Sequence, residues 1–352
     1  MSLGPIMLDL QGPELLPEER DLLDHPLAGG VILFSRNYRT PDQLTKLVAD
    51  IHQRKEPRLL VAVDHEGGSV QRFRDSFTTL PAAARFGETY DHDPITACGL
   101  AEQCGWVMAV ELRAHDVDFS FAPVLDLGKG PGRVIGNRAL HRDPEIIAKL
   151  AKSFQRGVRR AGMAAVGKHF PGHGTVEADS HVDVPIDERT LETIYQKDLV
   201  PFEQMIHAGL PAIMPAHVIY PQVDDKPAGF SSVWLRTILR NQLGFNGAIF
   251  SDDITMTGAA VMGTSIERAH AALEAGCDMV LVCNDRKGVQ DILDGLGKHS
   301  DPVATTRLAR MHGHGQCHWD DLLSWENYRQ ATASLRALEP EPELDLHDDG
   351  PA

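Results

Sequence analysis

The stretch AGMAAVGKHF, residues 161–170, contains the pattern that decides the fold. Gly162 follows a helical run, and glycine suits a helix end because it readily adopts the left-handed conformation of a C-terminal cap. The residues after it are short, almost entirely apolar and end in Lys168 and His169. A run of this kind is typical of a strand that is buried on both faces. The stretch therefore predicts a helix, a tight turn and a buried strand with a charged end.

The same unit recurs along most of the chain. We predict strands within residues 5–10, 30–34, 58–64, 118–126, 163–170, 212–220, 247–252 and 279–284. Helical patterns lie between them at 41–55, 94–115, 144–161, 199–208, 234–243 and 265–275, several opening with Pro, Ser or Asp. Gly209, Gly244 and Gly276 repeat the position of Gly162, each just past a helical run.

Strands that alternate with helices so regularly predict a parallel sheet, and eight repeats favour a closed (β/α)8 TIM barrel. A doubly wound open sheet is the alternative, but the first turn lacks the GxGxxG of its nucleotide-binding version. We expect one catalytic domain over residues 1–338, with closing helices from about Lys287 to Leu338. The stretch HGHGQCHWDD (312–321) receives no assignment, and the acidic, Pro-rich end (339–352) is predicted to be a disordered tail.

Composition narrows the function. The chain has 352 residues, of which 42% are apolar, 34 are basic and 50 are acidic, for a formal charge of -16. This excess of negative charge argues against nucleic acid or an anionic membrane as the main partner. No secretory signal or membrane-spanning run is visible. Five cysteines without CxxC spacing suit a cytoplasmic protein without disulfides. We expect a small-molecule substrate and a monomer.

Charged or amide side chains stand where the predicted strands end. Asp64, Asp126, Lys168 with His169, Asp252 with Asp253, and Asn284 end strands, and His217 lies within one. In a barrel of this kind, the loops after the strands converge on one mouth, where catalytic groups gather. An apolar strand has no general reason to end in a charge, so the repetition predicts a functional site.

Each of these residues also has a purely structural interpretation. For Asp126 alone, a helix cap or turn is favoured over catalysis, and Asp253 could be a cap while Asp252 is functional. His217 fits a core histidine as well as a functional one. Lys168 is harder to explain in this way, because a buried ammonium needs a partner or a ligand. Gly67 and Gly68 fit a tight turn without any ligand.

The segment that follows the fifth strand, GKHFPGHGTVEADSH (167–181), contains three histidines and two carboxylates. Considered alone, it fits a metal site, a proton-transfer device or a solvated loop. His169, His173 and His181 are the candidate ligands of a zinc hydrolase, with Asp252 or Asp64 completing the shell. However, the spacings typical of zinc sites are absent, and Lys168 beside His169 would repel a cation.

Several motifs together resemble a known family. They are VAVDHEGGSVQRF (61–73), FAPVLD (121–126), IGNR (135–138), GKHFPGHG (167–174), DSH (179–181), MPAHVIY (214–220) and FSDDITMTGA (250–259). In this order they resemble the single-domain bacterial β-N-acetylhexosaminidases of glycoside hydrolase family 3, the NagZ type. The resemblance covers about residues 4–290. IGNRAL departs slightly from the IGxRS pattern of the family but keeps Arg138.

The resemblance implies a (β/α)8 barrel that removes terminal N-acetylglucosamine from peptidoglycan fragments during cell-wall recycling, without a metal or other cofactor. It implies that Asp252 is the nucleophile and that His181 with Asp179 forms the acid/base pair. The sugar-binding positions that match the family are Asp64, Arg72, Arg138, Lys168 and His169. Larger members carry a second domain with an acid/base residue, for which this chain has no room.

These residue types are suited to such a reaction. Retaining glycoside hydrolysis needs a nucleophile and a group that first donates and then accepts a proton. Histidine suits the second role because its ordinary pKa is near 6.5, and Asp179 could hold the ring of His181. Glycines and Pro171 around this segment suggest a loop that closes over the substrate.

Two further alternatives stay open at this stage. The first is a non-catalytic sugar-binding barrel, which the low aromatic content of 6% disfavours because few rings are available for stacking. The second keeps the same site but transfers the glycosyl group to phosphate. A histidine acid/base favours this reaction more than a carboxylate would, since a carboxylate repels that anion.

Overall fold

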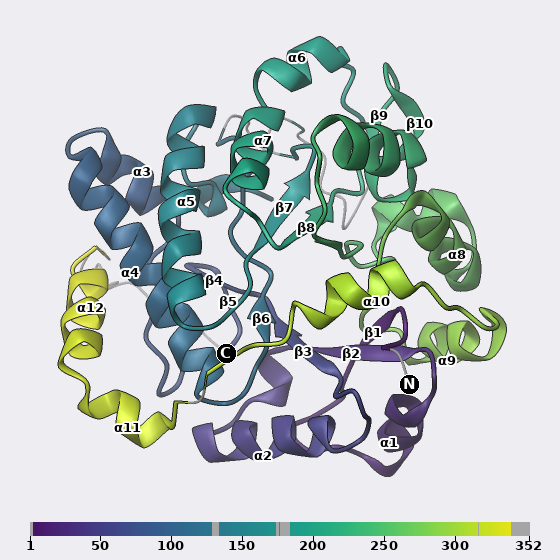
Figure 1. Ribbon diagram of the computed structural model, residues 1–352, viewed down its shortest axis with the longest axis horizontal. Helices are drawn as coiled ribbons and strands as arrows, with labels where there is room; N and C mark the ends of the chain where they lie inside the picture. Colours follow the sequence, from purple (N-terminus) through teal and green to yellow (C-terminus); the bar gives the residue numbers. More distant parts are fainter. Residues whose placement is uncertain (1–2, 129–133, 174–175, 177–183, 316, 339–352) are drawn as a thin grey trace, which may run out of the picture.

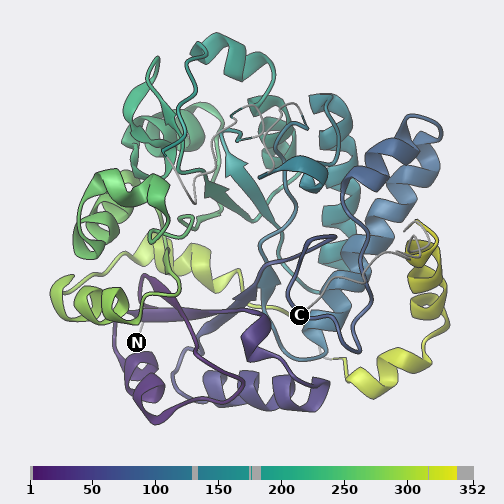
Figure 2. The same cartoon turned by 180° about the vertical axis from the view of Figure 1, so that it is seen from behind.

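The computed structural model describes residues 3–128, 134–173, 176, 184–315 and 317–338. Strands occupy the middle of the molecule and helices surround them, as Figure 1 and the reverse view in Figure 2 show. The protein therefore has an α/β fold in which the sheets are buried. None of the described helices is both long and apolar enough to cross a membrane.

Eight parallel strands form the centre, and they confirm the eight predicted runs. They are β1 (Ile6–Asp9), β2 (Ala28–Leu33), β3 (Leu60–Val63), β6 (Phe119–Ser120), β7 (Val166–Phe170), β8 (Ala212–Pro215), β11 (Ala248–Ile249) and β12 (Val280–Val282). Only β2 begins outside its predicted run, two residues before Gly30. Every residue of these strands is buried, as near-continuous apolar runs require.

The strands pair in two sheets, with the orders β12-β1-β2-β3-β6 and β11-β8-β7. Isolated parallel bridges join them at both edges. Phe119 pairs with Ala164 and Val124 with Lys168 between β6 and β7, and Phe250 pairs with Met279 between β11 and β12. Because β6 and β11 have only two residues each, these junctions are single bridges and not ladders. One continuous closed sheet is therefore not seen, and the closed barrel stays a prediction.

Helices follow the central strands along the chain. They are α1 (Pro17–Asp24), α2 (Pro41–His52), α3 (Ala84–Tyr90), α4 (Pro94–Arg113), α5 (Pro144–Arg160), α6 (Leu191–Gln196), α7 (Leu199–His207), α8 (Ser265–Ala275) and α9 (Arg286–Gly295). Short 3₁₀ helices lie at η1 (Ser35–Asn37), η2 (Gly136–Arg138), η3 (Ala228–Phe230) and η5 (Thr257–Met262). The segment predicted as an α-helix at 234–243 is a π-helix, η4 (Val233–Gln242).

Side-chain caps and glycines set the helix ends as predicted. The hydroxyl of Thr40 accepts from the backbone of Gln43 at the start of α2, and Thr264 forms a capping box with Glu267 at the start of α8. At the other ends, Gly162 and Gly276 have φ values of 77° and 126°. These conformations are strained for residues with a side chain, so the glycines stop the helices and turn the chain toward the next strand.

Two antiparallel hairpins were not predicted. The first pairs β4 (His65–Gly67) with β5 (Val70–Gln71), and the second pairs β9 (Ile219–Tyr220) with β10 (Asp224–Pro227). Gly67 and Gly68, with φ values of 103° and 55°, form the turn of the first hairpin. The tight turn expected for this glycine pair is confirmed, and it lies directly after β3.

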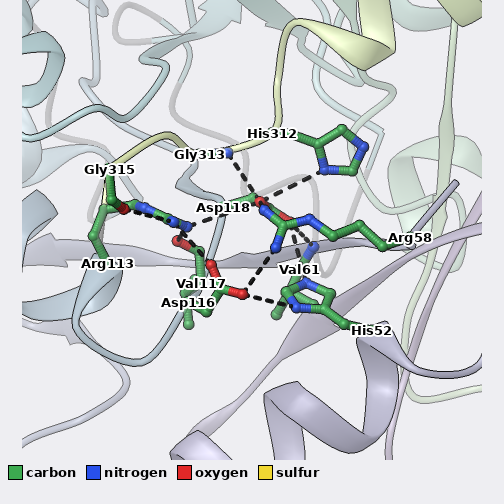
Figure 3. Close-up of polar contacts among 10 residues, drawn as sticks. All are labelled: His52, Arg58, Val61, Arg113, Asp116, Val117, Asp118, His312, Gly313 and Gly315. Atoms are coloured by element: carbon green, nitrogen blue, oxygen red, sulfur yellow. Dashed lines mark hydrogen bonds and ion pairs between the residues drawn. The ribbon is translucent and has the colours of Figure 1, made fainter. Parts of the chain in front are cut away.

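The predicted closing helices follow α9 as α10 (Pro302–Ala309), α11 (Trp319–Ser324) and α12 (Glu326–Arg336). Within the unassigned stretch 312–321, Gly313 donates its backbone N–H to the buried carboxylate of Asp118 at 2.9 Å. Asp118 also accepts from Val61 and from Arg58, and Figure 3 shows these groups converging on it. This stretch therefore fastens the closing helices to the start of β6. The predicted tail, 339–352, lies outside the described residues.

Candidate active site

A cleft lies at the ends of the central strands, where the polar residues were predicted to gather. Six of the eight predicted site residues line it: Asp64, Arg72, Arg138, Lys168, His169 and Asp252. These residues lie at or just after the ends of β3, β5, β7 and β11, or in η2. The first and the last of them, Asp64 and Asp252, are almost 190 positions apart in the sequence. The other two, Asp179 and His181, lie outside the described residues.

Lys168 has two carboxylate partners. Its Nζ lies 2.8 Å from Oδ1 of Asp64 and 2.6 Å from Oε1 of Glu66, and its side chain is only 3% exposed. Burial alone would lower the pKa of Lys168, but the two carboxylates outweigh it and raise that pKa. The ammonium is therefore charged, and the partner that a buried lysine requires is present.

Glu66 was missed in the sequence and stands at the centre of these ion pairs. Arg138 donates from Nε and Nη2 to its two carboxylate oxygens, both at 2.8 Å. Burial raises the pKa of Glu66, but Lys168 and Arg138 together lower it to about 2. Glu66 lies on β4, outside the strand-end positions that drew attention to Asp64. The sequence feature that could have identified Glu66 is the HEGG segment, in which a carboxylate comes directly before a glycine turn.

Arg72 keeps donors free at the cleft. Its Nη2 lies 3.7 Å from Oδ2 of Asp64, and its guanidinium lies over the ring of Phe34, 5.4 Å from the centroid. The Nε atom has no hydrogen-bond partner among the described residues. A guanidinium that is held by a ring face and a long ion pair, with an unused N–H, is suited to donate to a ligand hydroxyl.

Asp126 holds His169 and the segment behind it. Its Oδ2 lies 2.7 Å from Nδ1 of His169, and its Oδ1 accepts from the backbone of His173 at 2.6 Å. The favoured interpretation of Asp126 as a helix cap or turn former is therefore wrong, because its partners come from β7 and the residues after it. Sequence could not show this, since the contact joins residues more than 40 positions apart.

The two aspartates after β11 differ in environment. Asp253 accepts hydrogen bonds from the hydroxyl and backbone of Thr255 and from the backbone of Cys283. It therefore stabilises the turn after β11, in line with the interpretation of Asp253 as a structural residue. Burial raises the pKa of Asp253 to about 6 despite these bonds. Among the described residues, Asp252 accepts a hydrogen bond from the backbone of Asp253, at 2.8 Å, and it lines the cleft.

Besides His169, two further histidines, His217 and His173, are buried near the cleft. His217 is fully buried, its Nε2 lies 3.0 Å from the carbonyl of Asp253, and its ring stacks on Phe230 with centroids 5.0 Å apart. Burial lowers the pKa of His217, so its ring is neutral at neutral pH. It does not line the cleft, which favours the core interpretation. His173 does line it, and burial lowers its pKa too.

The metal-site alternative finds no support in the described part of the chain. No group of three or more His, Cys, Asp or Glu side chains there is placed to hold a metal ion. His169, which lines the cleft, already uses Nδ1 on Asp126, and the ammonium of Lys168 precedes it in the chain. His181, the third candidate ligand, lies outside the described residues.

Within the described residues, the geometry defines a polar cleft in which Asp252 makes no ion pair, bordered by fixed cations and carboxylates, as glycoside hydrolases use. Residues 7–310 match the glycosyl hydrolase family 3 N-terminal domain. The chain therefore belongs to glycosyl hydrolase family 3.

Similar proteins specify the activity. A beta-hexosaminidase of Thioalkalivibrio sulfidiphilus is 57% identical over 346 residues, covering 98% of this chain and 99% of that one. A beta-hexosaminidase of Thiobacillus denitrificans is 58% identical over 314 residues, covering 89% and 88%. The protein is thus a β-hexosaminidase, a glycoside hydrolase.

The fold has a counterpart of known structure. NagZ from Neisseria gonorrhoeae, solved in complex with N-trifluoroacetyl-D-glucosamine, superposes with a TM-score of 0.91 at 45% identity. The match covers 96% of this chain and 98% of that chain. The α/β fold of this protein is therefore NagZ-like over nearly its whole length.

Proposed function

We propose that this β-hexosaminidase removes terminal, non-reducing N-acetylglucosamine from peptidoglycan fragments in the cytoplasm, as part of cell-wall recycling. Its substrates would be N-acetylglucosaminyl-1,6-anhydro-N-acetylmuramic acid with or without a stem peptide. The observation that carries the proposal is the cleft, which combines Asp252 with the fixed groups Asp64, Lys168 and Arg138. The ligand named for the Neisseria gonorrhoeae structure, an N-acylated glucosamine, is of the same sugar class.

The cleft chemistry supports binding of a neutral sugar. Arg72, Lys168 and Arg138 offer N–H donors, and Asp64 offers acceptors, so one sugar hydroxyl can both donate and accept. Because the carboxylates of Glu66 and Asp64 offset the charges of the neighbouring cations, the cleft does not carry a large positive charge that would select an anion. His169, with Nδ1 held by Asp126, keeps Nε2 for a further hydroxyl.

In the proposed reaction, the carboxylate of Asp252 attacks the anomeric carbon as the glycosidic bond breaks. Protonated His181 gives its proton to the departing oxygen, which leaves as the alcohol of the anhydromuramic acid. Neutral His181 then takes a proton from water, the water oxygen attacks the anomeric carbon, and Asp252 is released as a carboxylate. Asp179 is proposed to orient the His181 ring and to stabilise its charged form. The sugar keeps its anomeric configuration.

The first experiment tests the nucleophile. Asp252→Ala should lower kcat on an aryl N-acetyl-β-D-glucosaminide by more than about 10⁴-fold, because the covalent route is removed. Asp225→Asn, an exposed aspartate on β10, is the matched control and should keep full activity. A 2-deoxy-2-fluoro sugar analogue should trap a covalent adduct on Asp252. Near-wild-type turnover of Asp252→Ala would refute the mechanism.

Further measurements separate the alternatives. Hydrolysis of a panel of aryl glycosides, with product analysis on anhydromuropeptides, tests the sugar, the linkage and the natural substrate together. Activity that survives prolonged chelation supports a reaction without metal. Turnover that rises with phosphate and yields a sugar 1-phosphate would favour transfer to phosphate over hydrolysis.

We also propose that the eight strands close into one (β/α)8 barrel in a single domain over residues 1–338, and that the protein is a monomer. The bridges Phe119–Ala164, Val124–Lys168 and Phe250–Met279 support closure, since they join the two sheets at both edges. A crystal structure with ladders across both junctions would establish the barrel, and an open junction would exclude it. Light scattering checks the monomer.

A further inference from the structure

Glu111 is a buried carboxylate that the mechanism does not use. It lies on α4, is 0% exposed, and makes no ion pair among the described residues. Its oxygens accept instead from three neutral donors: the hydroxyl of Thr78 at 2.5 Å, the backbone N–H of Thr78 at 3.1 and 3.2 Å, and the hydroxyl of Tyr328 at 2.5 Å. A charge without a cation is costly to bury, so this group requires an explanation.

The network continues from Thr78 toward the cleft. The carbonyl of Thr78 accepts from Nε2 of Gln71 at 2.8 Å, and the same Nε2 donates to the carbonyl of Phe73 at 3.0 Å. Oε1 of Gln71 accepts from the backbone of Leu80 at 2.9 Å. The side chain of Gln71 therefore ties together both ends of the loop that contains Arg72. Arg72 itself lines the cleft.

The other end of the network lies in the C-terminal helices. Tyr328 belongs to α12, which packs against α4 at the edge of the molecule in Figure 1. The neighbouring α11 contributes Trp319, whose ring lies 5.2 Å from that of Phe77. Both contacts end on residues 77 and 78, so the closing helices are packed against the loop that follows β5.

We propose that Glu111 is a positioning residue of the glycosidase site: through Thr78 and Gln71 it sets the place of Arg72, and Tyr328 brings the C-terminal helix into the same network. The inference rests on the proposed role of Arg72 in binding the sugar. The ionised carboxylate accepts all three donors at once. Once protonated, its own O–H must donate to one of the two hydroxyls, which then has to turn.

The network should therefore respond to pH in the neutral range. Burial raises the pKa of Glu111 to about 7, although its hydrogen bonds oppose this shift. The other groups that face it are Tyr328 and Arg336 on α12, Cys104 on α4, and Tyr38. Burial raises the pKa of both tyrosines and of the thiol, so none of them changes charge near pH 7.

Glu111→Gln tests the proposal in the full chain, because glutamine imitates the neutral acid. We expect KM for an aryl N-acetyl-β-D-glucosaminide at about pH 8 to rise about five- to tenfold, the equivalent of one ordinary hydrogen bond. The kcat should change less than about twofold, which is no more than the scatter of the kinetic measurement. In the wild type, KM should fall as pH rises from about 6 to 8, and this step should be absent in the variant.

Two further variants keep the test valid if Glu111→Gln does not fold. Tyr328→Phe removes the hydroxyl donor of Tyr328 and leaves the ring. Thr78→Val removes the hydroxyl donor of Thr78, whereas Thr78→Ser retains a hydroxyl at this position and should have the wild-type KM. Glu102→Gln is the matched control on the same helix, since Glu102 pairs with Arg156 and Arg160 at the surface. It should not alter KM.

Arg72→Lys separates this inference from the function on which it rests. If Arg72→Lys leaves KM and the affinity for N-acetylglucosamine unchanged, the sugar-binding role of Arg72 is wrong. A second outcome would overturn the proposal. In it, Arg72→Lys weakens binding, but the variants of Glu111, Thr78 and Tyr328 keep the wild-type KM and its pH step and lower only the melting temperature. Glu111 would then have a structural role alone.

Discussion

Arg138 donates two hydrogen bonds of 2.8 Å to the two carboxylate oxygens of Glu66. The same carboxylate lies 2.6 Å from the ammonium of Lys168, which in turn contacts Asp64. Glu66 thus connects residues of a hairpin, a 3₁₀ helix and a strand end. Its oxygens are occupied by protein cations, so its role is to fix the groups that face the cleft.

Glu66→Gln should damage both stability and binding. The change leaves Arg138 without a charged partner and Lys168 with Asp64 alone, and breaking a buried ion pair costs about 3–5 kcal/mol. We expect a lower melting temperature and a KM raised at least about tenfold, since two sugar-facing cations lose their fixed positions. Glu88→Gln, which breaks the exposed pair with Arg85, is the control and should change stability by less than about 1 kcal/mol. A Glu66→Gln variant with normal KM would show that Glu66 does not position these cations.

Asp126→Asn tests how His169 is held. The amide can keep the hydrogen bond from His173 but loses the charge that faces the His169 ring. A hydrogen bond to a charged group contributes about 1.5–3 kcal/mol, so kcat/KM should fall about 10- to 100-fold. Steady-state kinetics on an aryl N-acetyl-β-D-glucosaminide measure this, with Asp291→Asn at the exposed pair with Lys287 as control. Equal kcat/KM in the two variants would contradict the assignment.

The sequence predicted what depends on local pattern. Alternating apolar runs located all eight central strands, and strand-end charges such as Lys168 and Asp252 located the cleft. Glu66 was missed because it lies on a short hairpin, whose pairing depends on a glycine turn and not on apolar periodicity. Asp126 was misinterpreted because its partners are distant in sequence. The roles of Asp179 and His181 stay predictions.

Glu111 should make the protein less stable as pH rises through neutrality. Its pKa in the folded protein is about 7, raised by burial above the ordinary 4.5. The folded state therefore holds a proton that the unfolded state loses, and the stabilisation is present below about pH 4.5 and lost as pH rises through about 7. The shift corresponds to about 3 kcal/mol. Glu111→Gln should flatten the fall in the free energy of unfolding between about pH 5 and 8, measured by urea denaturation. An unchanged slope would contradict the raised pKa.

Gly313 fastens the closing helices, and Gly313→Ala should loosen them without harming catalysis. An added Cβ would lie 2.3 Å from Nη1 of Arg113, while the backbone N–H of Gly313 must reach Asp118. Such overpacking typically costs about 1–3 kcal/mol. Because Asp118 precedes β6 and the cleft lies at the opposite ends of the strands, kcat should stay within about twofold of wild type.

Gly99→Ala is the matched control for Gly313→Ala. Its Cβ would meet no atom within 4 Å, and Gly99 lies inside α4, where alanine is favoured over glycine by about 1 kcal/mol. The two variants should therefore shift the melting temperature in opposite directions, and a loss of kcat in Gly313→Ala would show that this end of the central strands is coupled to the site.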